Sequence, residues 1–151
     1  VMYEVLRPSR MVCVDPWTNA FSFSIACDML AKYQNVRFLR NRSQDALPEM
    51  LTDSFDFVYI DGDHSKEVCA NDIRQALRLV RLYGVVGGHD YGLPPQKITV
   101  NPERFPLTYD SDIYAQVHAA VCSVFEGYYV DALDCDWWVI VTPEIKKLGG
   151  M

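Results

Sequence analysis

The chain has 151 residues, a length that fits one domain with a hydrophobic core of its own. Half of the residues are hydrophobic and 23% are charged, as in ordinary globular proteins, and the net charge of -6 argues against non-specific nucleic-acid binding, which needs a basic face. No apolar run reaches the roughly 18 to 20 residues of a membrane span, and the first ten residues do not resemble a signal peptide.

The cysteines are odd in number, and no two of them have CxxC spacing. They are Cys13, Cys27, Cys69, Cys122 and Cys135. Most lie inside apolar patterns, which favours buried free thiols in a reducing compartment over disulfides or a zinc site. We therefore expect a cytoplasmic protein without nucleic-acid or membrane partners.

The N-terminal part of the chain predicts a strand, a helix and a second strand. Residues 11–14 form a short apolar run that is typical of a buried strand. A helix is predicted over residues 18–33, and either Thr18 or Asn19 can cap it. The segment "NVRFLR", residues 35–40, is the second strand.

The middle of the chain continues the alternation of helices and strands. Ser43 can cap the next helix, whose first turns Pro48 should weaken. The run "FDFVYI", residues 55–60, is a third strand, and residues 66–82 have the spacing of a helix. Residues 83–92 indicate a tight turn, a strand and a glycine-rich exit.

The C-terminal part predicts a loop, a helix and a hairpin. Residues 93–108 are proline-rich and polar, and loops of this length often serve as lids or binding loops. A helix follows, with apolar residues from 113 to 124 on one face, and residues 128–133 and 137–142 are two strands whose short connection forces an antiparallel pair. The order of elements predicts a Rossmann-like three-layer α/β sandwich with a mostly parallel sheet and a C-terminal antiparallel hairpin.

Polar residues follow three of the predicted strands at the edge where an open parallel sheet binds its ligands. They are Asp15 after the first strand, Asp61, Asp63 and His64 after the third, and His89 and Asp90 after the fourth. A single acid at such a point is more often a helix cap or part of a solvated turn. Three strand ends that bring polar residues to one rim favour a site.

Four motifs, in this order, give the chain a resemblance to a known family. They are "VDPW", "NRSQDAL", "FDFVYIDGDHSKE" and "GGHDY". They resemble the class I S-adenosylmethionine-dependent methyltransferases, most closely the branch related to macrocin-type and catechol-type O-methyltransferases. The likeness runs from about residue 10 to the end. It implies one methyltransferase-like domain over residues 1–151 that methylates an oxygen, or less readily a nitrogen, of a small molecule or sugar.

The resemblance also implies a cofactor site for S-adenosylmethionine. Asp15 would accept hydrogen bonds from both ribose hydroxyls, and Asp61 would lie beneath the cofactor. Trp17 would stack on the adenine, although core packing explains it equally well. Ser43 would lie near the adenine, cap its helix, or do both.

In the metal-dependent relatives, the acid that matches Asp61 also binds Mg²⁺ or a similar ion, and Asp90 with His89 would complete that set. Such an ion lowers the pKa of an acceptor hydroxyl. Asp63 would be the general base, while His64 is a second candidate base or a group that orients Asp63. Relatives have two acids where this chain has His89 and Asp90. Because imidazole prefers zinc, iron, nickel or copper, the sequence leaves the identity of the metal undecided.

The acceptor pocket has fewer sequence signals than the rim. Phe21, Trp17, Tyr91 and the loop 92–110 are the candidates for its lining. His118 lies in the middle of a helical pattern, and we expect it to be a surface or partly buried residue.

The family's first unit, a strand, a glycine-rich turn and a helix, has no counterpart in this sequence, since none of the eight glycines precedes Gly62. That strand is central in the family fold, and its absence would leave neighbouring strands unpaired. Either the N-terminally truncated fold closes the gap, or residues 1–6 fill it as a short strand, or two chains pair their edges. We expect self-association as a homodimer.

Two other functions compete with methyl transfer. The first is a non-catalytic domain that keeps the fold but binds no cofactor, which the missing glycines favour. The second is a metal-dependent enzyme of another class, such as a hydroxylase or hydrolase, with His64, His89 and Asp90 around one ion. Whether the chain is an enzyme therefore stays open in the sequence.

Overall fold

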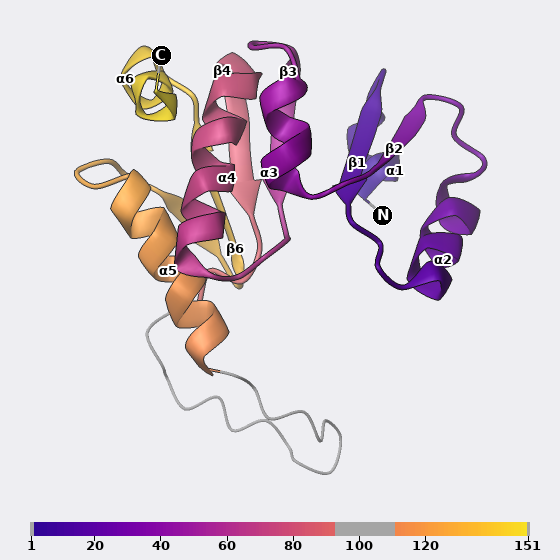
Figure 1. The fold of residues 1–151 in the computed structure, drawn as a ribbon. Helices are drawn as coiled ribbons and strands as arrows, with labels where there is room; N and C mark the ends of the chain where they lie inside the picture. Colours follow the sequence, from indigo (N-terminus) through magenta and orange to yellow (C-terminus); the bar gives the residue numbers. More distant parts are fainter. Residues whose placement is uncertain (1, 93–110, 151) are drawn as a thin grey trace. The chain divides into compact units, whose positions relative to one another are not determined.

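A computed structural model describes residues 2–92 and 111–150 of the chain (Figure 1). These residues belong to two compact units, Val1–Glu49 and Met50–Met151. Among the helices of the described ranges, none is both long and apolar enough to cross a membrane.

The N-terminal unit contains a parallel pair of strands with short helices. Its elements are α1 (Met2–Leu6), β1 (Met11–Asp15), α2 (Ala20–Leu30), β2 (Val36–Arg40), α3 (Ser43–Ala46) and a 3₁₀ turn (Leu47–Glu49). β1 and β2 pair in parallel from Met11 opposite Val36 to Asp15 opposite Arg40. Because residues 2–6 are helical, the alternative in which residues 1–6 fill a gap as a strand is wrong.

The two helix caps predicted in this unit have opposite outcomes. Asn19 caps α2, since its side-chain oxygen accepts a hydrogen bond from the N–H of Phe21 at 2.9 Å. Ser43 does not cap α3, because Arg42 occupies the N-cap position and the Ser43 hydroxyl instead donates to Gln44 Oε1 at 3.3 Å. The helix here is also shorter than the apolar spacing suggested, because the chain tightens to a 3₁₀ turn at Leu47–Glu49, which contains proline.

The second unit contains a four-stranded sheet, helices and a C-terminal 3₁₀ turn. Its elements are β3 (Phe55–Ile60), α4 (Lys66–Leu79), β4 (Val80–Gly88), α5 (Ser111–Val124), β5 (Asp131–Leu133), β6 (Asp136–Ile140), α6 (Pro143–Lys146) and a 3₁₀ turn (Lys147–Gly149). The strand order is β3-β4-β6-β5. β3 and β4 are parallel, whereas β6 is antiparallel to both of its neighbours, which confirms the predicted C-terminal hairpin.

The sequence placed the end of α4 too late. α4 ends at Leu79 and β4 begins directly at Val80, so the predicted helix to residue 82 is wrong. The reason is tertiary, because Val80 is fully buried in the core and its carbonyl accepts a hydrogen bond from Lys146. These contacts hold the residue in a strand although the local spacing is still helical. The turn predicted after the helix corresponds to an irregularity inside β4, where Tyr83 has a φ angle of 65° and the register with β3 shifts.

The core of this unit lies between the sheet and helices α4 and α5, which lie side by side over one sheet face (Figure 1). Its largest buried side chains are Ile73, Leu77, Val80, Val86, Val121, Trp137 and Val141. The opposite face carries Phe57, Tyr59, Val85 and Trp138, which line a groove of about 180 Å³. The two faces follow the alternation of side chains along each strand.

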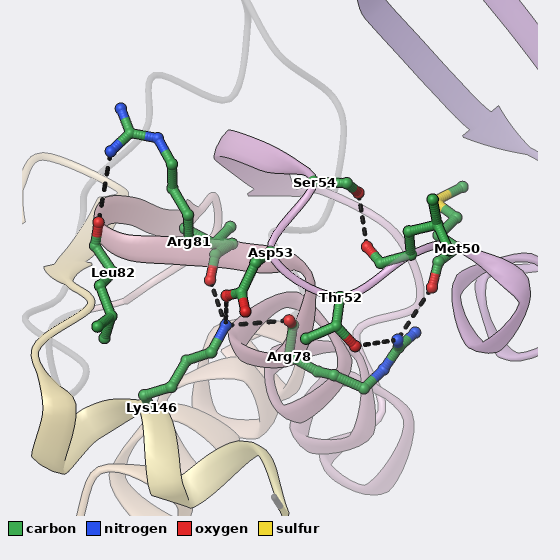
Figure 2. Close-up of polar contacts among 10 residues, drawn as sticks. Met50, Thr52, Asp53, Ser54, Arg78, Arg81, Leu82 and Lys146 are labelled. Atoms are coloured by element: carbon green, nitrogen blue, oxygen red, sulfur yellow. Dashed lines mark hydrogen bonds and ion pairs between the residues drawn. The ribbon is translucent and has the colours of Figure 1, made fainter.

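A buried lysine ties the C-terminal helix to the junction of α4 and β4 (Figure 2). The ammonium group of Lys146, with only 8% of its side chain exposed, donates to the carboxylate of Asp53 at 2.6 Å and to the carbonyl of Arg78 at 3.0 Å. The Val80 carbonyl is its third acceptor. Arg78 itself donates to the carbonyl of Met50 at 2.9 Å.

Four of the six described strands are paired in parallel, as the α/β class predicts, but the parallel pairs form two separate ladders. Within the described ranges, β1 pairs with β2 alone and β3 pairs with β4 alone. β4 lies between β3 and β6, whereas β1, β2 and β3 have one described neighbour each. The expected effect of the missing unit on strand pairing stays a prediction.

Candidate active site

Strands β3 and β4 bring the predicted rim residues together. Because the strands are parallel and Ile60 pairs with Gly88, their carboxyl ends lie side by side. The N–H of His89 donates to the Ile60 carbonyl at 3.0 Å, which extends the ladder beyond the last paired residues. Asp61 therefore follows one strand at the point where His89 and Asp90 follow the other.

The two glycines of "GGHDY" allow this close approach. A Cβ atom on Gly88 would lie 2.5 Å from the Ile60 carbonyl oxygen and 2.9 Å from Nε1 of Trp137. A Cβ atom on Gly87 would lie 2.6 Å from the carbonyl oxygen of Trp137. All three distances are too short for a side chain, so β4 fits between its neighbours only with glycine at these positions.

Asp90 has a left-handed backbone conformation that its neighbours hold in place. Its φ angle is 59°, a value that Asp and Asn adopt more readily than most residues. The next residue, Tyr91, donates its N–H to the Cys135 carbonyl at 2.9 Å, and Gly92 donates to the Asp90 carbonyl at the same distance. Only 14% of the Asp90 side chain is exposed.

The Asp90 carboxylate lies between two imidazoles. Its Oδ2 is 2.6 Å from Nε2 of His64, and its Oδ1 is 3.0 Å from Nδ1 of His89. Nε2 of His64 is buried and makes no hydrogen bond, although Oδ2 is so near. The carboxylate oxygen therefore lies off the direction in which a ring N–H would point.

Asp61, His64 and Asp90 form the group of potential metal ligands in the described part of the chain. One ligand atom from each lies within 4.8 Å of the other two. A water-sized space of about 10 Å³ adjoins Asp61 and His64 and is lined also by Asp63, His89 and Trp137. His89, the expected third ligand, instead contacts this group through Asp90.

Asp63, the expected base, lies in the same loop but outside this group. It is exposed, and Oδ1 accepts the N–H of Ser65 at 2.8 Å. The hydroxyl of Ser65, and then its N–H, lower the pKa of the Asp63 carboxyl below its ordinary value. The carboxylate is therefore ionised at neutral pH and open to solvent.

A tyrosine that the sequence did not single out lies beside the rim. The hydroxyl of Tyr59 donates to Oδ1 of Asp136 at 2.6 Å. Burial, followed by this hydrogen bond and the charge of Asp136, raises the pKa of Tyr59 well above its ordinary value. The signal in the sequence was the alternation along β3, which sets Tyr59 on the face opposite Val58 and Ile60.

The other predicted cofactor residues belong to the N-terminal unit. Asp15 ends β1 with an exposed side chain and accepts the N–H of Trp17. The ring of Trp17 is half-buried and packs 5.1 Å from that of Phe23 and 5.6 Å from that of Phe38, while its role toward the adenine stays a prediction. Ser43 is half-buried at the first position of α3.

The expected acceptor-pocket residues are dispersed in the chain. Phe21 is 72% exposed on α2. In the second unit, burial raises the pKa of Tyr91, and its ring lies 5.0 Å from that of the half-buried His118. Of the loop 92–110, residues 93–110 lie outside the described residues.

Comparison with solved structures shows the fold. A protein from Corynebacterium glutamicum is 22% identical with a TM-score of 0.59, and the match covers 88% of this chain and 61% of that one. A candidate O-methyltransferase from Klebsiella pneumoniae is 15% identical with a TM-score of 0.62, over 93% of this chain and 76% of that one. The chain thus spans less than two thirds of the Corynebacterium protein.

Comparison with protein families shows the family to which the chain belongs. Among curated proteins there is no significant match. A family model described as a methyltransferase domain matches residues 2–91, and the narrower macrocin-type branch stays a prediction. Because this match covers more than half of the sequence and includes the rim of β3 and β4, the chain belongs to the methyltransferase-domain family, which implies S-adenosylmethionine as the methyl donor.

Proposed function

We propose that the protein transfers the methyl group of S-adenosylmethionine to a hydroxyl oxygen of a small molecule or sugar, with help from a divalent metal ion. Family membership supports methyl transfer. The choice of an oxygen acceptor is supported by one observation: Asp61, His64 and Asp90 lie together at one rim, next to the ionised Asp63. Such a set suits an acceptor oxygen that a metal can hold.

Two acids at strand ends are suited to the cofactor. Asp15 ends β1 and Asp61 follows β3, and both side chains are exposed at the carboxyl ends of parallel strands. In this proposal, Asp15 accepts hydrogen bonds from the ribose hydroxyls. In the second unit, the carboxylate of Asp61 suits a positively charged sulfonium electrostatically.

The rim residues fit a divalent ion by their chemistry. Two carboxylates supply negative charge, and the buried Nε2 of His64 lacks a hydrogen-bond partner. Asp61, His64 and Asp90 would hold the ion, which when bound lowers the pKa of an acceptor hydroxyl.

The transfer itself requires a nucleophile, a leaving group and a base. The acceptor oxygen attacks the methyl carbon, the carbon–sulfur bond breaks, and its electron pair stays on sulfur to give S-adenosylhomocysteine. The hydroxyl proton passes to Asp63, which is ionised at neutral pH and exposed next to the rim. His64 is less suited to this role, because its Nε2 is buried against Asp90.

A calorimetric titration of the folded protein with S-adenosylhomocysteine tests the proposal. We expect micromolar binding that is lost in Asp15→Ala. Asp28→Ala is the matched control, since this exposed acid lies on α2 in the same unit and should bind as the wild type does. No binding at millimolar ligand would overturn the proposal and favour a fold that no longer holds the cofactor.

A further inference from the structure

We infer that Asp61, His64 and Asp90 form a mixed oxygen and nitrogen metal centre that binds a transition ion such as Mn²⁺ in preference to Mg²⁺. The inference specifies the metal site of the proposed function, and it rests on that function for where the acceptor binds. It differs from the set expected from the sequence, in which His89 rather than His64 completed the site. The two histidines differ, because Nε2 of His64 is buried without a hydrogen bond whereas the side chain of His89 is 42% exposed.

The spacing of the three groups is near that of ligands around one ion, although His64 and Asp90 are closer together than bound ligand atoms would be. Ligand atoms at roughly 2.1 Å from a metal lie about 3 Å apart at right angles and about 4.2 Å apart across the ion. The Nε2 of His64 is 2.6 Å from Oδ2 of Asp90, and all three ligand atoms are within 4.8 Å of one another. A slight change in side-chain torsions would therefore place one ion among them.

His64 is oriented as a ligand and not as a hydrogen-bond donor. A salt bridge between a histidine and a carboxylate normally has a ring N–H that points at an oxygen. Here Nε2 is buried, Oδ2 is 2.6 Å away, and no hydrogen bond joins them. A ring nitrogen that is buried beside two carboxylates without a hydrogen-bond partner is suited to donate its lone pair to a cation.

His89 has the place of a supporting group. It is 42% exposed, and Nδ1 lies 3.0 Å from Oδ1 of Asp90, the oxygen that does not face His64. This ion-pair distance places His89 behind the carboxylate, on the side where partners of metal ligands commonly lie. Asp90 can thus offer one oxygen to the ion while His89 holds the other.

The ligand types determine which ions are preferred. Mg²⁺ favours a full set of oxygen ligands and near-octahedral geometry, whereas imidazole suits first-row transition ions. One imidazole and two carboxylates therefore favour Mn²⁺ or a later ion of that row. The small space beside the group, about 10 Å³, suits an ion or a water molecule better than a larger ligand.

Electron paramagnetic resonance of Mn²⁺ added to the metal-stripped full chain tests this assignment. The chain contains three histidines, so each can be changed separately in His64→Gln, His89→Gln and His118→Gln. Bound Mn²⁺ is counted from the loss of the free-ion signal, and spin-echo modulation reports a directly bound imidazole nitrogen. Competition with Mg²⁺ gives the ratio of affinities.

We expect one Mn²⁺ per chain, nitrogen modulation in the wild type, and displacement only by at least about tenfold more Mg²⁺. His64→Gln should remove the modulation and weaken Mn²⁺ binding about tenfold or more. The modulation should persist in the other two variants. The inference is overturned if millimolar Mn²⁺ does not bind, if Mg²⁺ competes equally, if the wild type lacks nitrogen modulation, or if His89→Gln alone removes it.

The same preparations separate this inference from the proposed function. Titration with S-adenosylhomocysteine in the presence of a chelator reports the cofactor site without the metal. A chain that binds the cofactor product but gives no Mn²⁺ signal contradicts the metal centre alone. A chain that binds Mn²⁺ through His64 but not the cofactor product contradicts methyl transfer alone.

Discussion

The ammonium group of Lys146 lies 2.6 Å from the carboxylate of Asp53, although the two residues are far apart in the sequence (Figure 2). Lys146 also donates to the carbonyls of Arg78 and Val80, where α4 ends and β4 begins. A positive charge near the C-terminal end of a helix is favourable, and here three acceptors compensate its burial. The contact therefore ties the C-terminal helix to the point where α4 gives way to the strand.

Replacing this lysine should destabilise the second unit. Lys146→Met keeps much of the side-chain volume but removes the ion pair with Asp53 and the ammonium donor to the Val80 carbonyl, while the Arg78 carbonyl keeps the N–H of Asp53 at 3.2 Å. We expect a loss of about 1–3 kcal/mol in the free energy of unfolding. Lys147→Met is the control, because Lys147 is exposed and should change stability by less than about 0.5 kcal/mol. Urea unfolding followed by circular dichroism measures both. Equal stability of the two variants would contradict this account.

A methyl group at Gly88 should separate the strands that form the rim. Gly88→Ala places Cβ 2.5 Å from the Ile60 carbonyl, so the backbone has to move, and we expect a cost of about 1–3 kcal/mol. Gly62→Ala should be nearly neutral, since a Cβ atom there has no heavy atom within 4 Å. Thermal unfolding of both variants tests the prediction. The prediction is wrong if the two alanine variants have the same melting temperature.

The hydrogen bond between Tyr59 and Asp136 should make stability depend on pH in the alkaline range. Because the pKa of Tyr59 is raised in the folded state, the unfolded chain loses this proton first, from about pH 10, and stability falls as pH rises. Below that pH the contribution is fully present. Tyr59→Phe should reduce this decrease in the free energy of unfolding with pH. Tyr129→Phe, which changes an 82% exposed tyrosine, should not reduce it. Urea unfolding from pH 8 to about 11.5 measures the slopes, and an unchanged slope in Tyr59→Phe would refute the prediction.

Two cysteines should differ strongly in their reactivity. Cys69 is 2% exposed, and burial, with a smaller effect of Asp72, raises its pKa to about 11. Cys122 is exposed on α5. Iodoacetamide at neutral pH should therefore label Cys122 in the native protein and Cys69 only after unfolding, because thiolates react and thiols do not. Mass spectrometry of the peptides measures this order of labelling, with Cys122→Ser as the control. Rapid labelling of Cys69 in the native protein would contradict the prediction and show that solvent reaches its side chain.

The sequence predicted the elements better than their ends. Short segments rich in apolar residues identified β1, β2 and β3, although the residues of these strands are half-buried or exposed and not buried as the sequence suggested for β1. The end of α4 was missed because the spacing stays helical beyond Leu79, while the signal that stops the helix is the distant Lys146. Ser43 was misassigned as a cap because it has the right residue type, although Arg42 occupies that position.

The candidate site could be predicted as a region but not as a set of contacts. The rule that parallel sheets bind ligands at their carboxyl ends placed Asp61 and Asp90 together, and the register of β3 and β4 confirms that they follow adjacent strand ends. Which imidazole faces which carboxylate oxygen depends on side-chain torsions that no sequence pattern encodes. The pair of Tyr59 and Asp136 depends on the pairing of β4 with β6 and was not predicted for the same reason.

The left-handed backbone at Asp90 limits how this position can vary during evolution. Most residues are strained at a φ angle of 59°, whereas Gly, Asn and Asp tolerate it. Of these three, only Asp and Asn carry an oxygen that can bind a cation, and only Asp brings a charge. A library with every amino acid at position 90, selected only for folding, should therefore retain mainly these three residues, so an aspartate here records the demands of the backbone as well as those of chemistry.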